Sequence, residues 1–101
     1  MTESTQPSPI EARQAEVNQY QQNIVLFTAI LQTLPTEWPE HLIAYRAIKD
    51  KHTSIAEIES LNDVELLSKL WYADECRAAI RSETVEMTKS AAILSFLKSQ
   101  V

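Results

Sequence analysis

Ile-Val-Leu-Phe-Thr-Ala-Ile-Leu occupies residues 24–31, and its only polar side chain is that of Thr28. On a helix that turns by about 100° per residue, the apolar side chains of this segment fall on all sides. A helix that is apolar all round is expected to be buried all round. The segment is much shorter than the roughly 20 apolar residues that span a bilayer. It therefore predicts a core or interface helix and no membrane partner.

The composition indicates a helical protein. The chain has 101 residues, of which 45% are hydrophobic and 23% charged, and it contains no glycine. This length suits one domain with one modest core. Tight hairpins and phosphate-binding loops need glycine where the backbone takes positive φ or approaches a ligand. We therefore predict an all-α bundle of four to five helices, with a mobile tail over residues 1–8 and a single domain over residues 9–101.

The charge balance restricts the partners and the compartment. The formal net charge is -5, whereas binding to a nucleic acid backbone requires clustered Lys and Arg. Nucleic acid is therefore not expected as a partner. The first residues lack the pattern of a secretory signal, and the single cysteine cannot form an internal disulfide. A cytoplasmic location is expected.

The first helix has a clear start signal. Ser8 is a suitable N-cap, Pro9 suits the first helical position, and Glu11 completes a capping box. The helix is predicted from Pro9 to about Thr33, as a long and central element. Two rows of apolar residues along it predict one continuous stripe against a partner helix. These rows are Ile10, Val17, Ile24 and Leu31, and Tyr20, Phe27 and Leu34.

Further helices are predicted after a break at residues 34–39, which contains two prolines. With Thr36 as N-cap, one helix is expected over residues 37–51, and a short one over residues 55–60. A capping box of Asn62 with Glu65 predicts a helix over residues 63–82, followed by one over residues 84–100. Because neither Gly nor Pro occurs at residues 82–84, one long bent helix remains an alternative for the last two.

Asp74 lies where the pattern of its helix predicts an apolar residue, among Leu67, Leu70 and Trp71. A buried carboxylate without a partner is costly or becomes neutral. Asp74 therefore needs an arginine or a tyrosine hydroxyl, either as a polar pair that fixes the helix register or as part of a binding pocket. The candidates for this polar core or pocket are Asp74, Arg77, Arg81, Arg13 and His41.

Catalytic and metal-binding patterns are weak. The chain has no Glu-x-x-His, which the carboxylate-bridged di-iron bundles require. Cys76 has no His close to it in sequence to serve as a base. No catalytic residue, metal or cofactor is predicted. The acidic residues between Ser54 and Glu65 suit helix N-termini, although they are also able to dock a basic surface.

The two-sided apolar run suggests that the first helix meets a second copy, in a closed dimer. The candidate interface residues are Tyr20, Ile24, Val25, Leu26, Phe27, Ile30, Glu57, Glu59 and Tyr72. The sequence favours a small acidic interaction or regulatory module, with a protein partner or itself, and with no catalysis of its own. The alternative is a small-molecule-binding or enzymatic helical bundle with a polar pocket around Asp74.

Overall fold

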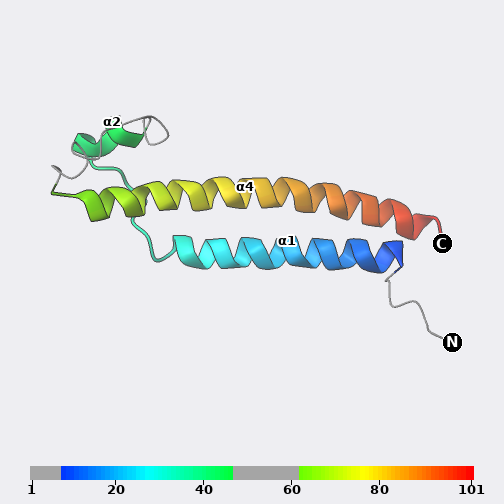
Figure 1. Ribbon diagram of the computed structural model, residues 1–101. Coiled ribbons are helices and arrows are strands. Elements are labelled where there is room, and N and C mark those ends of the chain that lie inside the picture. The colour runs from blue at the N-terminus through cyan, green and yellow to red at the C-terminus, as the bar shows by residue number, and fades with distance from the viewer. Residues whose placement is uncertain (1–7, 47–61) are drawn as a thin grey trace.

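The computed structural model describes residues 8–46 and 62–101. They form the helix α1 (Pro9–Leu31), a 3-10 turn η1 (Glu40–Leu42), the short helix α2 (Ile43–Arg46) and the long helix α4 (Val64–Ser99). The described part of the chain is all-α, as predicted, and contains no strand. The helices α1 and α4 lie side by side and run in opposite directions (Figure 1).

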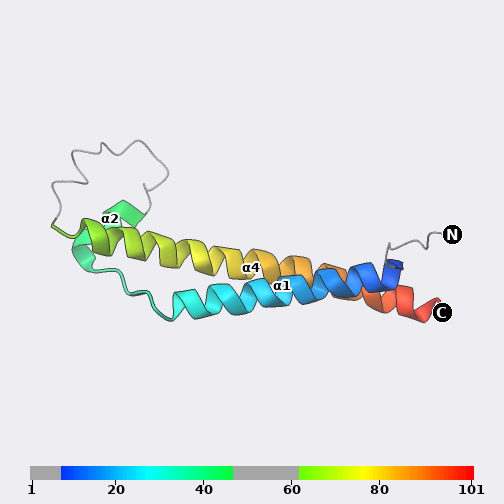
Figure 2. The same cartoon turned by 60° about the horizontal axis from the view of Figure 1, so that its bottom comes forward.

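The chain is elongated. Its radius of gyration is 20.3 Å and its extents are 65 × 30 × 24 Å, whereas a compact domain of this length has a radius of gyration of about 13 Å. The described residues form one long hairpin and not the predicted bundle of four to five helices. Helix α1 is not central either, because α4 is its single long neighbour (Figure 2). The helix predicted over residues 55–60 lies outside the described residues.

Helix α1 begins where the sequence predicts. The Ser8 side chain accepts a hydrogen bond from the Glu11 amide at 3.1 Å, and Pro9 occupies the first turn. The helix ends two residues before the predicted Thr33. The amides of Thr33 and Leu34 bond to carbonyls three residues back, at 3.0 and 3.1 Å. This tightening satisfies two terminal carbonyls before Pro35 stops the helix.

The predicted stripe of α1 faces α4, but its burial is incomplete. The stripe residues are partly buried, and no α1 residue is fully buried. The expectation that residues 24–31 are buried all round is wrong for the single chain, in which Val25 is 63% exposed and Leu26 57% exposed. The reason is geometric: one neighbouring helix covers only one side of α1.

Helix α4 is continuous through the predicted join at residues 82–84. Thr84 does not cap a new helix, because its hydroxyl donates to the Ile80 carbonyl at 2.7 Å. Thr88 donates in the same way to the Thr84 carbonyl at 2.8 Å. Both threonines thus satisfy their hydroxyls within a helix interior. The separate helices over residues 63–82 and 84–100 are wrong, and the long-helix alternative is correct.

Asp63, and not Asn62, stands at the N-cap position of α4, and its side chain does not cap the helix. Its carboxylate instead contacts His41 Nε2 at 2.8 Å. The predicted capping box of Asn62 and Glu65 is therefore absent. The acid that precedes α4 ties the 3-10 turn η1 to the start of the helix.

The predicted helix over residues 37–51 is much shorter in the described part of the chain. Thr36 does not cap it, because η1 begins after Pro39, and residues 47–51 lie outside the described residues. The segment still provides the small core of the molecule, since Leu42 is fully buried against Leu67 and Leu70 of α4. The partly buried side chains around this cluster are Trp38, Tyr45, Leu66 and Trp71.

We predict that Leu70→Ala lowers the free energy of unfolding by about 2–5 kcal/mol, because it opens a cavity in the only fully buried leucine cluster of the described residues. Thermal and urea unfolding followed by circular dichroism measure the change. Val25→Ala, at a side chain 63% exposed, is the control and should change stability by at most about 0.5 kcal/mol. Equal effects of the two substitutions would contradict this placement of the core.

Candidate functional site

Asp74 is the centre of a clasp that holds α2 on α4. Its Oδ2 accepts a hydrogen bond from Arg46 Nε at 2.9 Å, and its Oδ1 accepts one from Arg46 Nη2 at 3.0 Å. Arg77, one turn further along α4, also pairs with Oδ1. The Arg46 guanidinium lies 5.4 Å from the centroid of the Trp38 ring. Two parallel hydrogen bonds and an aromatic neighbour hold this guanidinium in one orientation.

The electrostatics of Asp74 follow from these partners. Burial by itself would raise the pKa of the carboxyl, but the hydrogen bonds from Arg46 and Arg77 outweigh burial and lower the pKa below its usual value. Asp74 is therefore held as a carboxylate with both oxygens occupied. This arrangement suits a structural anchor, because a carboxyl group with a lowered pKa is a poor acceptor of a substrate proton.

The structure separates the other expected pocket residues from Asp74. Arg13 contacts Glu16 at 3.1 Å and donates to the Ser90 hydroxyl at 3.2 Å, near the far end of the hairpin. His41 contacts Asp63. Arg81 is exposed, and within the described residues it makes no hydrogen bond to Asp74. Arg46, the main partner of Asp74, was not among the expected residues. The sequence predicts a helix around Arg46 but does not show which residues of α4 that helix faces.

A polar layer crosses the seam between α1 and α4. Asn23 donates to Glu83 Oε1 at 3.4 Å, and Tyr20 donates to Glu16 Oε1 at 3.2 Å. The second carboxylate oxygen of Glu83 is buried without a hydrogen-bond partner. Partial burial and the Glu16 carboxylate raise the pKa of Tyr20, with further contributions from Glu86 and Glu83.

Sequence reasoning missed this polar layer, although a signal for it exists. Along α4, the residues Ile80, Glu83, Met87, Ser90 and Leu94 follow one another at alternating intervals of three and four residues. Following that alternation through residues 82–84 would have placed both polar residues in the seam. The predicted helix boundary at this point interrupted the pattern.

The expected interface residues divide into two groups. Tyr20, Ile24, Phe27 and Ile30 are partly buried, whereas Val25, Leu26 and Tyr72 are exposed. Glu57 and Glu59 lie outside the described residues. The apolar side chains of α1 thus serve two purposes, since some pack in the hairpin and others remain accessible.

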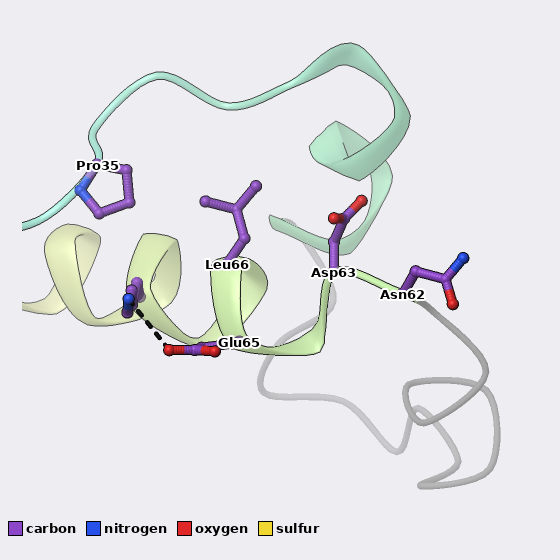
Figure 3. Close-up of a pocket in the computed structure, with 6 residues that line it drawn as sticks. Pro35, Asn62, Asp63, Glu65 and Leu66 are labelled. Carbon is purple, nitrogen blue, oxygen red and sulfur yellow. Dashed lines mark ion pairs between the residues drawn. The ribbon is translucent and has the colours of Figure 1, made fainter.

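Asp74 lines neither of the two best-formed cavities of the described residues. One, of about 410 Å³, lies along α1 and is lined by Asn18, Gln21, Gln22 and Val25. The other, of about 370 Å³, lies where the linker after α1 passes the first turns of α4 (Figure 3). Its residues are Pro35, Asn62, Asp63, Glu65, Leu66 and Lys69. Glu65 and Lys69 pair with each other at 3.2 Å, so their charges are already balanced.

Other chemistry has little support in the geometry. Cys76 is free and buried. Over residues 8–46 and 62–101, no three His, Cys, Asp or Glu side chains gather in a way that would hold a metal ion. Neither long helix of this part of the chain contains a stretch that is long and apolar enough to cross a membrane.

No protein family model matches the chain, and neither a curated protein nor a solved structure matches it. The interpretation of its function therefore depends on the geometry described above.

We predict that Asp74→Asn lowers the free energy of unfolding by about 1–3 kcal/mol at pH 7, because it removes the charge that Arg46 and Arg77 bind. The folded state lowers the pKa of Asp74, so its stabilisation is present above the unfolded pKa of about 4 and is lost as the pH falls through the folded pKa. The difference between wild type and variant should therefore shrink in acid. Urea unfolding at pH 7 and in acid measures this difference.

The matched control is Glu65→Gln, which removes an exposed ion pair on the same helix. Exposed pairs of this kind contribute at most about 1 kcal/mol. A difference between wild type and Asp74→Asn that stays constant with pH would contradict the clasp.

We predict that the double substitution Asn23→Leu and Glu83→Leu raises the free energy of unfolding by about 1–2 kcal/mol. It replaces a long hydrogen bond and an unpartnered buried oxygen with apolar contact. Urea unfolding measures the change. Asn18→Leu, at an exposed position on α1, is the control and should have little effect. A loss of stability in the double variant would show that the polar layer stabilises the hairpin.

Proposed function

We propose that this chain is a small acidic interaction module, a helical hairpin that acts by binding protein, with a second copy of itself as its first partner. The observation that supports this function is the exposure of large apolar side chains along the hairpin. They are Val25, Leu26, Ile43, Tyr72, Val85, Ile93, Phe96 and Val101. Apolar side chains that gather on one surface of a soluble protein mark association sites.

The polar groups favour the same interpretation. The carboxylate of Asp74 is occupied by Arg46 and Arg77, and the acids beside the cavity of Figure 3 are paired with His41 and Lys69. Charge in the hairpin thus fixes its shape, while the exposed apolar residues are available for association. We place the module in the cytoplasm, where the free thiol of Cys76 would remain reduced.

Light scattering on a sizing column, with the full chain between about 1 and 100 µM, tests the proposal. We expect a mass of twice the 11.5 kDa of one chain, with the fraction of dimer rising as the concentration rises. A mass of one chain at every concentration would overturn self-association and with it this proposal.

A further inference from the structure

One side of the hairpin carries several exposed apolar side chains. On α4, Tyr72, Ala79, Glu86 and Ile93 follow one another at intervals of seven residues and therefore share one side of the helix, so Glu86 interrupts the apolar row. In an antiparallel helix pair, the rows of residues that flank the contact on the same side in each helix, seen from its own N-terminus, come together on one side of the pair. On α1 this row contains Leu26 and Ile30, which therefore lie on the same side of the hairpin as Tyr72. We call this surface the apolar face. Its residues are Leu26, Ile30, Tyr72, Ala79, Ile93 and Phe96.

The apolar face is accessible in the single chain. Phe96 is 62% exposed, Tyr72 44% and Ile93 41%. The segment that contains η1 and α2 packs elsewhere, because Leu42 and Arg46 contact α4 at Leu70 and Asp74. Those two positions lie about 160° around the helix from Tyr72. Among the described residues, the clasp therefore lies on the opposite side of α4 from the apolar face.

The surface area of the chain is large enough for a stable dimer. Its accessible surface is 7432 Å², whereas a compact monomer of this mass has about 5,800 Å². The excess of about 1,600 Å² is twice the roughly 800 Å² that each partner buries in a standard interface.

The sequence of α4 suits a second copy in the antiparallel direction. Tyr72 lies ten residues before Ser82, and Ile93 lies eleven residues after it. A two-fold axis at Ser82 would therefore place Tyr72 of one copy opposite Ile93 of the other. The small side chains of Ala79 and Ser82 near the axis would allow the two helices to approach closely.

The charges on this side of α4 have the same symmetry. Glu75 precedes Ser82 by seven residues, and Lys89 follows it by seven. Across the axis, each acid would face the base of the other copy. Glu75 has an interaction within its own chain, and Lys89 pairs with Glu86 at 3.4 Å, so a pair across the axis would add to these interactions. Opposite charges at equal distances from a centre favour a copy of the same chain over an unrelated protein.

We propose that the apolar face is the interface of a homodimer, in which the two α4 helices run antiparallel across a two-fold axis near Ser82. This inference rests on the proposed function and specifies the surface and the symmetry of the association. The dimer is a bundle of two hairpins. Each copy contributes the same residues, as in any closed two-fold contact.

The first experiment compares two substitutions at equally exposed apolar residues. Phe96, on the apolar face, is 62% exposed, and Val25, on the other side of the hairpin, is 63% exposed. Sedimentation equilibrium measures the dissociation constant of each variant. We expect Phe96→Asp to raise it by about 10–100-fold and Val25→Asp by less than about threefold. A dimer that tolerates Phe96→Asp but is lost in Val25→Asp would overturn the proposed face.

The second experiment tests the axis. In a Cys76→Ala background, Ser82→Cys should form a disulfide-linked dimer under mild oxidation, because the two thiols would meet at the axis. Ser95→Cys, thirteen residues further along α4, should remain mostly unlinked. Equal linking of both variants, or preferred linking at Ser95, would overturn the axis at Ser82.

The results separate this inference from the proposed function. If the wild type is a dimer but the variants behave in the opposite way to that expected, the proposed face is overturned and self-association remains. A wild-type monomer at every concentration overturns both. Circular dichroism of each variant checks that the helices form, so that a loss of folding is not taken for a loss of dimer.

Discussion

In an antiparallel helix pair, each helix has a single long neighbour, and this constraint governs the rest of the structure. The stripe of α1 that begins at Ile10 finds its partner in α4, where it is only partly buried. A pair of helices encloses no space that is covered on all sides, so most of the seam remains at the surface. Three of the four largest fully buried side chains lie where a third segment adds to the pair, at Leu42, Leu67 and Leu70, whereas Cys76, Ser90 and Leu94 are buried further along α4.

Because a helix pair buries few side chains fully, the clasp between Arg46 and Asp74 adds polar contacts to the small core. The segment that contains η1 and α2 covers one side of α4 with few apolar residues, and ion pairs complement them. Arg46 binds both oxygens of Asp74, and His41 binds Asp63 at the start of the helix. Charged residues thus act together with the apolar contacts of Leu42, Trp38 and Tyr45 to fix this short segment on α4.

The same constraint connects the fold to the proposed function. An elongated hairpin exposes more surface than a compact domain of equal mass, and here part of that surface is apolar. The polar layer at Asn23 and Glu83 lies inside the seam, whereas Leu26 and Phe96 lie outside it. Polar residues in the seam favour one register of the hairpin, and apolar residues outside it favour association.

The sequence by itself determined the features that depend on neighbouring residues. The N-cap at Ser8, the stop before Pro35 and the stripe of α1 are local or periodic, so they could be predicted from residue type and spacing. The absence of glycine likewise indicated an all-α chain. Asp74 was expected to need an arginine or a tyrosine hydroxyl, since the cost of an unpaired buried carboxylate does not depend on the fold, and its partners are Arg46 and Arg77.

Only the tertiary structure decided which residues meet. The main partner of Asp74 is Arg46, 28 residues earlier in the chain, and periodicity within one helix cannot identify such a pair. Helix α4 continues through Thr84, whose hydroxyl donates to a carbonyl one turn back and does not cap a new helix. The exposure of Val25 and Leu26 was decided by the number of neighbours that α1 has. An apolar pattern shows that a surface favours burial, but only the arrangement of the whole chain determines whether that chain covers it.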